Sequence, residues 1–406
     1  MDIARVLAPR MGRSDASGIR RVADLAKTMP GAINLSIGQP EFPVPEAVKA
    51  AAIEAIRADK NAYTPNPGLD QLRAKLAERL RGDVGWRVQA PGGVGTGSAS
   101  DPSLMITSGT AGALVLACMA VLGPGDEFII PDPFFVMYPY LAAMCDAKAV
   151  RCETYPDFRM TAERVERLIT PRTKAVLFNS PNNPTGVVST MRDCAEMLDL
   201  CRRKGVLLIS DEIYDEFTFS ESRTDRFADG SRSACPSAAR LPGASDDVLL
   251  IRGFGKTYGC TGWRLGYAAG PAALIEQMVK LQQYSFVCAP TPLQWGALAA
   301  LDVDMSAQVA KYEARRDRVV AALSRVTEVA TPGGAFYAFP KVPDRLGETA
   351  QQFAERAIRE KVLVIPGGVF SGETANPRDT HLRLSFAVAD EKLGAGLGVL
   401  EKLMGG

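Results

Sequence analysis

The chain has 406 residues, of which 47% are hydrophobic and 23% are charged, and its formal net charge is +1. A chain of this length and composition can bury a large core and is expected to form two domains. The near-neutral charge argues against a nucleic-acid partner, and the single histidine, His381, argues against a histidine-rich metal site or a serine–histidine triad.

The middle of the chain alternates apolar runs with segments of helical character. Five apolar runs are predicted to be strands, at residues 104–107, 128–131, 175–179, 206–210 and 248–252. Their uninterrupted apolar character is typical of strands buried on both faces, as in a mainly parallel sheet. We therefore expect an α/β fold in which helices cover a central sheet.

The pattern changes after the predicted sheet. A long helical stretch at residues 306–326 is followed by alternating strand patterns and a final helix near residues 390–404. We interpret this part as a smaller α/β domain, which the N-terminal segment joins. The predicted division is a large domain at residues 46–292 and a small domain made of residues 1–45 and 293–406.

Two further segments are predicted to be loops. Residues 89–102 contain a glycine-rich run and are interpreted as a flexible surface insertion. A phosphate-binding loop is the alternative, but the segment lacks the lysine of the Gly-x-x-x-x-Gly-Lys motif. Residues 225–244 are interpreted as a polar loop to which no function can be assigned.

The most informative motif runs from Gly253 to Arg264 and reads Gly-Phe-Gly-Lys-Thr-Tyr-Gly-Cys-Thr-Gly-Trp-Arg. A lysine attacks an aldehyde to form a Schiff base when its pocket lowers its proton affinity, as Lys256 would do here. Arg264 would supply a planar two-donor fork for a phosphate. The motif therefore indicates a binding site for an aldehyde cofactor that carries a phosphate. When this segment is considered without the others, an ordinary surface lysine is the alternative.

Two polar clusters follow predicted strands. Asn-Asn-Pro-Thr-Gly at residues 182–186 follows one apolar run, and Asp-Glu-Ile-Tyr at residues 211–214 follows the next. Open α/β sheets bind ligands at the carboxyl ends of their strands. Taken singly, the first cluster is typical of a turn and the second of a helix N-cap, but together with the lysine motif they indicate one site.

With these motifs in this order, the chain resembles the class I/II aminotransferases, which are fold type I enzymes that use pyridoxal 5′-phosphate (PLP). The resemblance runs from about Ile33 to the C-terminus. It implies an aspartate aminotransferase-like fold, with a helix-covered, mainly parallel sheet and a smaller α/β domain. It also implies transfer of an amino group between an L-amino acid and a 2-oxo acid by a ping-pong route.

The resemblance assigns cofactor contacts to several residues. Lys256 would form the internal aldimine, Asp211 would pair with the pyridinium nitrogen, and Arg264 would grip the phosphate. Asn183 and Tyr214 would hydrogen-bond the 3′-oxygen of the ring. PLP is an electron sink only while its ring nitrogen is protonated, and a nearby carboxylate favours that protonated form. Once the substrate has displaced it from the cofactor, the Lys256 amine would shuttle a proton. Positioned proton transfer of this kind raises a rate by roughly 10²–10⁴-fold. Lys256, Asp211 and Tyr214 are thus the predicted catalytic residues.

The predicted phosphate site includes the start of a helix. Residues 107–114 follow a short apolar run and open an apolar helix, whose N-terminal amides would bind an anion; an ordinary strand-to-helix turn is the alternative. The family pattern indicates Gly109, Thr110 and Ala111 as the contacts. The chain departs from the family at Gly253, where a serine is usual, so one hydroxyl donor is missing and its replacement is open.

Two aromatic residues match further family positions. Phe135 follows a predicted strand and would stack on the PLP ring, although a core phenylalanine is the alternative. Tyr63 matches a tyrosine that reaches the phosphate in the neighbouring subunit. This match implies a homodimer with shared active sites.

The substrate contacts are predicted from the same resemblance. Arg383, in an alternating segment near the C-terminus, would receive the α-carboxylate through its two-donor fork; an exposed strand arginine is the alternative. Asn183 and the backbone of Gly38 would also contact the substrate, because only glycine lets the backbone approach so closely. Residues 286–290, a region that the family often uses to line the neighbouring pocket, are apolar and favour a neutral amino donor.

Three functions remain open from the sequence. The first is the aminotransferase, and the second is a PLP-dependent carbon–sulfur lyase or related synthase on the same fold, since the cofactor site alone does not decide the reaction. The third is the PLP-sensing domain of a transcription regulator. It would need a DNA-binding domain ahead of the aminotransferase-like part, which here begins within the first few dozen residues.

Location is predicted from cysteines and apolar runs. The eight cysteines include no Cys-x-x-Cys pair and several lie in apolar patterns, which favours reduced thiols. The N-terminus lacks the apolar stretch of a signal peptide, and no stretch of about eighteen apolar residues occurs. We expect a cytoplasmic protein without a membrane partner.

Overall fold

The computed structural model describes residues 3–13, 18–89, 101–371 and 379–405. Residues 90–100, which form most of the predicted glycine-rich insertion, lie outside the described residues.

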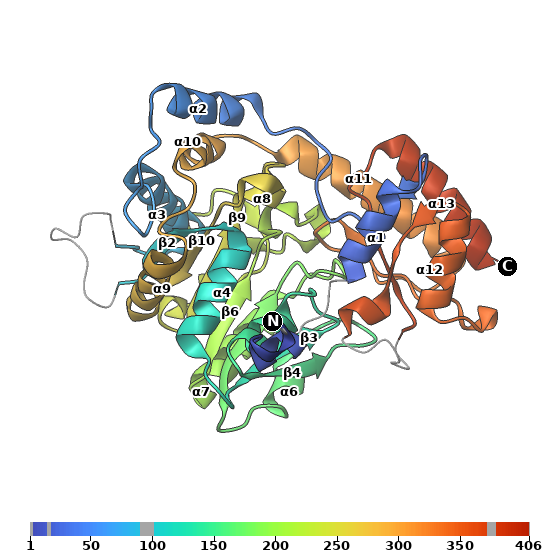
Figure 1. Cartoon of the computed structure of the whole chain (residues 1–406), viewed down its shortest axis with the longest axis horizontal. Coiled ribbons are helices and arrows are strands. Elements are labelled where there is room, and N and C mark those ends of the chain that lie inside the picture. Colours follow the sequence, from blue (N-terminus) through green and yellow to red (C-terminus); the bar gives the residue numbers. More distant parts are fainter. Residues whose placement is uncertain (1–2, 14–17, 90–100, 372–378, 406) are drawn as a thin grey trace.

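A central sheet forms the middle of the larger part (Figure 1). Its strands are β2 (Ser103–Thr107), β3 (Glu127–Asp132), β4 (Lys148–Glu153), β5 (Thr173–Asn179), β6 (Leu207–Asp211), β9 (Val248–Gly253) and β10 (Gly266–Gly270). They follow the order β2-β10-β9-β6-β5-β3-β4. β10 is antiparallel to both neighbours, whereas the pairs from β9 to β4 are parallel. The expected α/β fold with a mainly parallel sheet is confirmed, and β4 and β10 are the strands that the sequence missed.

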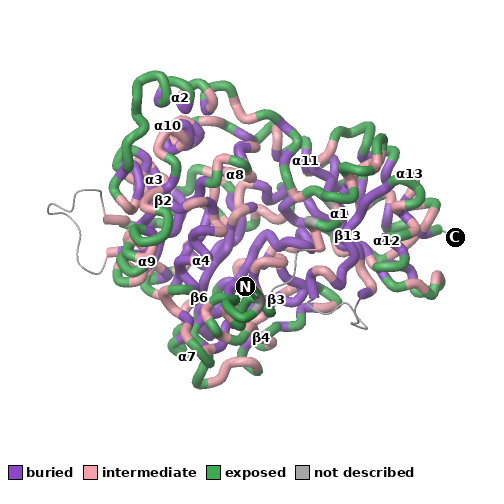
Figure 2. Tube along the Cα trace, viewed as in Figure 1, coloured by how far each residue is buried: buried purple, intermediate pink, exposed green. Residues whose placement is uncertain are grey.

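Both faces of the sheet are buried (Figure 2). In β5, Val176 and Phe178 pack into one core layer, and Ala175 and Leu177 pack into the other. Successive side chains of a strand point to opposite faces. A strand with a core on each side therefore consists of consecutive apolar residues, which is why these strands are legible in the sequence.

Helices cover the two faces. On one face lie α4 (Gly109–Val121), α5 (Tyr138–Met144) and α9 (Ala272–Ser285). The other layer takes apolar side chains from α3 (Asp70–Val84), α6 (Ala162–Glu166) and α7 (Met191–Lys204), while α2 (Glu46–Arg57) packs against α10 (Thr291–Ala300). Within the described ranges, none of the helices combines the length and apolar character that crossing a membrane requires.

The ends of α7 show how local sequence sets a helix. Thr190 and Asp193 form a reciprocal capping box at its start, and Gly205 adopts a left-handed conformation just after its end. Its last turn carries three basic residues, which complement the helix dipole.

A smaller group of elements lies at one end of the molecule (Figure 1). Its helices are α1 (Gly18–Lys27), α11 (Ser306–Leu323), α12 (Ala350–Arg359) and α13 (Asp390–Gly405). Its strands are β1 (Ile33–Asn34), β11 (Tyr337–Ala338), β12 (Val362–Leu363), β13 (Ile365–Pro366) and β14 (Leu382–Ser385). Parallel pairing of β1 with β12 joins the N-terminal segment to the C-terminal part. The division at residue 292 stays a prediction; α10 begins at that point and packs against α2 and α3.

The predicted polar loop at residues 225–244 is wrong in part. It contains an antiparallel hairpin of β7 (Asp225–Arg226) and β8 (Ser233–Ala234). Cys235, Ala238 and Ala239 follow the hairpin and are buried. Short strands with polar residues leave no apolar run, so the sequence could not indicate them.

Candidate active site

Several predicted site residues lie where parallel strands end. β5, β6 and β9 are parallel neighbours, so their carboxyl ends meet at one edge of the sheet. Asp211 is the last residue of β6, and Asn183 lies in the turn that follows β5. β9 leads directly into the short helix α8 (Phe254–Thr257), which carries Lys256. The predicted ligand edge thus gathers residues from three strands.

A cavity of about 290 Å³ opens at this edge. It brings together predicted residues from distant segments: Gly38, Thr110, Ala111, Phe135, Asn183, Asp211, Tyr214, Lys256, Arg264 and Arg383. It is also lined by polar residues that the sequence did not single out: Tyr138, Asn179 and Tyr337. We call this space the active-site cavity.

The Lys256 amine lies among positive charges. Its Nζ donates a hydrogen bond to the carbonyl of Gly38. Burial is the largest cause that lowers the pKa of Lys256, to about 7, and the positive charges of Arg383 and Arg264 add to it. Near neutral pH a large share of Lys256 is therefore the neutral amine, which is the form that attacks an aldehyde.

The Asp211 carboxylate is buried without a cationic partner among the described residues. Its Oδ2 accepts a hydrogen bond from the Tyr138 hydroxyl at 2.8 Å, and its Oδ1 accepts one from the Ile213 amide at 3.3 Å. Burial raises the pKa of Asp211 to about 6, although these two hydrogen bonds oppose the rise. Because an unpaired buried charge is costly, a positively charged ligand group would stabilise this carboxylate.

The Arg383 guanidinium is buried beside Asn183. Its Nη1 donates to Asn183 Oδ1 at 3.1 Å, and its Nη2 donates to the Ser36 carbonyl at 2.7 Å. Its Cζ lies 4.7 Å from the centroid of the Tyr337 ring. Within the described part of the chain its Nε has no hydrogen-bond partner. A buried guanidinium with spare donors suits a carboxylate ligand.

The Tyr214 hydroxyl lies 2.9 Å from the Tyr337 hydroxyl. Burial is the largest cause that raises the pKa of Tyr214 well above its usual value, so the phenol stays protonated. A Cβ atom at Gly38 would collide with the Tyr337 hydroxyl. Glycine at this position is therefore what allows the backbone to approach the tyrosine pair.

The start of α4 lies beside Arg264. The Ser108 side chain does not cap the helix, and the first amides of any helix have no intrahelical partner. Gly109 has a φ of 71°, and a Cβ atom there would lie 2.8 Å from Arg264 Nη2. Gly109 thus allows a guanidinium to reach the helix N-terminus, and the two together form a site for an anion.

Two side chains approach Gly253 closely. A Cβ atom on Gly253 would lie 2.7 Å from Ile213 Cδ1 and 3.0 Å from Thr110 Cγ2. A serine at this position would therefore require the end of the Ile213 side chain to shift. Thr110 brings its own hydroxyl to the start of α4.

Phe135 and Tyr63 have different surroundings. Phe135 is half-buried, lines the cavity and packs edge-on against Tyr138, with ring centroids 5.6 Å apart. Tyr63 does not line the cavity, and its side chain is 81% exposed. Among the predicted residues, Tyr63 is the one that the described chain does not bring to the site.

Three polar residues of the site were not predicted. Asn179 ends β5, and its Oδ1 accepts a hydrogen bond from the Asn183 amide at 3.1 Å; its place at the strand end is a signal that could have identified it. Tyr138 lies at the start of α5, about one turn after Phe135, which is a weaker signal. Tyr337 lies on a short strand far away in sequence, and nothing local indicates it.

These groups fit PLP. The uncompensated Asp211 carboxylate suits a protonated ring nitrogen, and the neutral Lys256 amine suits an aldehyde. Arg264 and the α4 amides suit a phosphate. Each charged or reactive part of the cofactor therefore has a counterpart on the cavity wall.

Comparisons with known proteins agree with this geometry. The family model described as aminotransferase class I and II matches residues 30–400. An aromatic-amino-acid aminotransferase of Thermococcus litoralis is 34% identical, with 98% of each chain covered. An aspartate aminotransferase of Pyrococcus abyssi is 33% identical over the same shares. The solved aspartate aminotransferase of Thermus thermophilus with maleate superposes with a TM-score of 0.85 at 31% identity, covering 98% of this chain and 99% of that chain.

The comparisons confirm the resemblance and favour amino-group transfer over the lyase and the regulatory domain. Polar residues converge at the carboxyl edge of the sheet as PLP chemistry requires, and the match extends over nearly the whole chain. The chain therefore belongs to the class I and II aminotransferases and is a PLP-dependent transaminase.

Proposed function

We propose that Lys256, Asp211 and Tyr214 are the catalytic residues of the transamination. Bound PLP supplies an electron sink for the bonds of the substrate α-carbon. The Lys256 Nζ, whose pKa is about 7, takes up and returns a proton at that carbon. The Asp211 carboxylate holds a proton on the ring nitrogen, and the Tyr214 hydroxyl donates to the ring oxygen.

We further propose the binding contacts. Arg264, Gly109, Thr110 and Ala111 bind the phosphate, Phe135 covers the ring, and Asn183 contacts the ring oxygen. Arg383 receives the α-carboxylate of the substrate, with Asn183 and Gly38 beside it. This arrangement is supported by the shared cavity and by the hydrogen bond from Arg383 to Asn183.

The amino donor is proposed to be a neutral amino acid with an apolar or aromatic side chain. The described cations that line the active-site cavity are Lys256, Arg264 and Arg383, and each already has a role. A second substrate carboxylate would need a further cation. The remaining lining side chains include Ile19, Leu114 and Met137, which are apolar. This charge inventory of one subunit's described residues is the observation that supports the proposal, and the apolar residues 286–290, from the region expected to line the neighbouring pocket, agree with it.

A panel of amino donors tests the substrate class. We expect kcat/KM for phenylalanine and leucine to exceed that for aspartate and glutamate by about tenfold or more, since burying an unpaired carboxylate costs at least about 1–3 kcal/mol. Conversion of bound PLP to its amine form, followed by absorbance, gives the readout. A preference for aspartate would contradict the proposal, and release of a sulfur leaving group without amino transfer would favour the lyase.

Thr110 is proposed to replace the serine that the family usually has at position 253. Its methyl carbon, Cγ2, lies 3.0 Å from the place where a Cβ atom of residue 253 would be. It also lies at the start of α4, where the helix dipole favours an anion. The Thr110 hydroxyl is bonded to the same Cβ atom as the Cγ2 methyl group, so it belongs to a side chain that borders the region of the missing serine.

Thr110→Val is expected to weaken PLP binding by about tenfold or more, because a hydrogen bond to a charged group contributes about 1.5–3 kcal/mol. Thr110→Ser keeps the hydroxyl and serves as the matched control, with near-normal affinity. Gly253→Ser is expected to weaken binding too, since its side chain would meet Ile213. Fluorescence titration of the cofactor-free protein measures all three; tighter binding by Gly253→Ser would refute the assignment.

We propose a homodimer in which Tyr63 contacts the phosphate bound by the partner subunit. The support is its match to the family position and the 81% exposure of its side chain in the single chain. A single exposed aromatic side chain is normal on a protein surface, so the exposure indicates that the Tyr63 ring is free to meet a partner subunit, and the family position is what identifies that partner. Tyr284 is 82% exposed and is a second side chain of this kind.

Mixing Tyr63→Phe with Lys256→Ala tests the shared site. If Tyr63 acts across the interface, a mixed dimer has one site with both lesions and one intact site. An equal mixture then recovers about a quarter of wild-type activity, because about half of the dimers are mixed. If Tyr63 acts within its own chain, mixing restores nothing. A Tyr63→Phe parent with clearly reduced activity is required, and size-exclusion chromatography of an active monomer would refute the dimer.

The location is proposed to be the cytoplasm. All eight cysteines are free thiols, and most of them are buried. A chain with this many cysteines and no disulfide suits a reducing compartment. The two-domain division at residues 46–292 and at residues 1–45 with 293–406 is retained as part of the proposal.

A further inference from the structure

A second cavity, of about 780 Å³, lies next to the lysine segment. Lys256 lines the active-site cavity, whereas Thr257 and Tyr258, the next two residues, line the second cavity. Its walls come from α3, the β7–β8 hairpin and the loop between α10 and α11. The volume lies in the range of small-molecule sites, and neither the proposed mechanism nor the proposed cofactor contacts use it.

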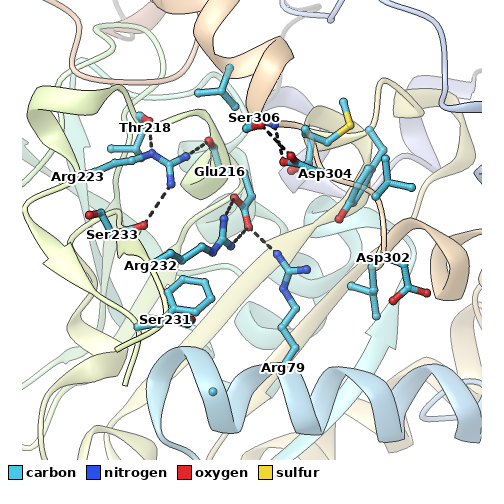
Figure 3. A pocket seen from close by; sticks show the side chains of 18 of the residues that line it. Arg79, Glu216, Thr218, Arg223, Ser231, Arg232, Ser233, Asp302, Asp304 and Ser306 are labelled. Atoms are coloured by element: carbon cyan, nitrogen blue, oxygen red, sulfur yellow. Dashed lines mark hydrogen bonds and ion pairs between the residues drawn. The ribbon is translucent and has the colours of Figure 1, made fainter. Parts of the chain in front are cut away.

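One wall of the second cavity is rich in arginine (Figure 3). Glu216 accepts hydrogen bonds from Arg79 Nη2 and Arg232 Nη2, both at 2.6 Å. Arg223 instead donates to main-chain carbonyls, those of Thr218 at 2.8 Å, Glu216 at 2.6 Å and Ser233 at 3.4 Å. Among the described residues, no carboxylate forms an ion pair with Arg223. Arg79 and Arg232 are thus paired with Glu216, which leaves Arg223 as the arginine of this wall without a carboxylate partner in the described ranges; Glu78, Asp229 and Glu313 also line the cavity.

The opposite wall carries Asp302 and Asp304 (Figure 3). Asp302 forms an ion pair with Lys75. Asp304 accepts hydrogen bonds from the Ser306 amide and hydroxyl, both at 2.9 Å, and pairs with no cation in the described part of the chain. The Ser306 amide and hydroxyl are the largest causes that hold the pKa of Asp304 below its usual value, with the Arg232 charge a smaller one. Asp304 is therefore an ionised carboxylate at neutral pH.

Apolar side chains form another part of the lining. Phe227, Leu301, Val303, Met305 and Val309 all line the second cavity. The Arg232 guanidinium covers one face of the Phe227 ring at 4.2 Å. A ligand in this cavity thus meets a cation, an anion and an apolar surface.

We propose that the second cavity binds an α-amino acid with an apolar side chain as a zwitterion. Its carboxylate would contact Arg223 and its ammonium group would contact Asp304, each forming charge-assisted hydrogen bonds. A dianionic ligand would face the Asp304 carboxylate, and a dicationic ligand would face the Arg223 guanidinium. A ligand that carries one charge of each sign satisfies both walls, and its side chain packs against Phe227 and Met305.

The binding test uses holoenzyme whose cofactor has been blocked with aminooxyacetate, so that the active site cannot take an amino acid. Isothermal titration with L-phenylalanine is expected to show saturable binding to one site per chain. 3-Phenylpropionate lacks the ammonium group and phenethylamine lacks the carboxylate. Each is expected to bind at least about tenfold more weakly, which corresponds to about 1.4 kcal/mol.

Variants locate the site. Arg223→Gln and Asp304→Asn are each expected to weaken L-phenylalanine binding at least about tenfold. Arg226→Gln, three residues after Arg223, in β7 and outside the cavity lining, is the matched control and should bind normally. Asp304 is exposed, and asparagine can still accept a hydrogen bond from Ser306, so Asp304→Asn decides the test even if Arg223→Gln lowers stability.

Three results would overturn the proposal. The first is the lack of saturable binding to the blocked holoenzyme. The second is equal affinity for 3-phenylpropionate, which would indicate a plain anion site. The third is normal binding by both Arg223→Gln and Asp304→Asn, which would place the bound amino acid elsewhere.

Discussion

Replacing Lys256 by alanine is expected to lower kcat by about 10⁴-fold, at the upper end of what positioned proton transfer contributes. The variant loses the amine whose lowered pKa allows it both to react with an aldehyde and to carry a proton. Lys280→Ala, on the exposed side of α9, is the matched control and should keep normal activity. Borohydride reduction of the holoenzyme and peptide mapping should attach the cofactor to Lys256; attachment to another lysine would refute the site.

The same lysine has a predicted pH dependence. Below a pH of about 7 the Lys256 amine is protonated and cannot attack, so the rate at which cofactor-free protein captures PLP should rise through that pH and level off above it. Arg383→Gln removes a positive charge that lowers the Lys256 pKa and should move the midpoint to higher pH. The ionisation of free PLP is common to both proteins. An unchanged midpoint would contradict the assigned cause.

Asp211→Asn is expected to lower kcat by about 10–10³-fold, because an opposite charge at short range shifts a pKa by about 1–3 units. Without this carboxylate the ring nitrogen loses its proton near neutral pH, and the electron sink weakens. Tyr138→Phe is the matched control: it keeps the carboxylate, removes the 2.8 Å hydrogen bond and should have a smaller effect. Steady-state kinetics and PLP titration give the two readouts.

A cofactor analogue with a permanently charged, N-methylated ring distinguishes an electrostatic role of Asp211 from a purely structural one. It should partly restore the turnover of Asp211→Asn, because the ring no longer needs the carboxylate to stay positive. A purely structural role for Asp211 predicts no restoration. Normal turnover by Asp211→Asn with ordinary PLP would remove the residue from the mechanism.

Local sequence was sufficient to predict the site residues that directly follow a buried strand, because the end of the strand places them in the site. Asp211 and Asn183 could be predicted because consecutive apolar residues mark buried strands and the carboxyl ends of parallel strands meet at one edge. Lys256 and Arg264 lie in one short motif, so no long-range contact was needed to connect them. The family resemblance then supplied roles that strand pattern alone does not give.

Contacts between distant segments could not be read in the same way. The hydrogen bond between Arg383 and Asn183 joins residues 200 positions apart, and the resemblance rather than any local pattern indicated it. The pairing of the Tyr214 and Tyr337 hydroxyls depends on how β11 packs against the large part. The direction of a side chain is set by its packed neighbours, which no short window of sequence contains.

By itself, the sequence determined the α/β architecture, the lysine motif and the cofactor. The first two depend on local residue order, and the cofactor follows from a family resemblance that covers most of the chain. Only the tertiary structure showed that the side chains of Ile213 and Thr110 lie beside Gly253. It also showed that Arg223, just ahead of the β7–β8 hairpin, and Asp304, in the loop between α10 and α11, line one cavity. Both features depend on contacts between side chains of distant segments, which come together only when the chain folds.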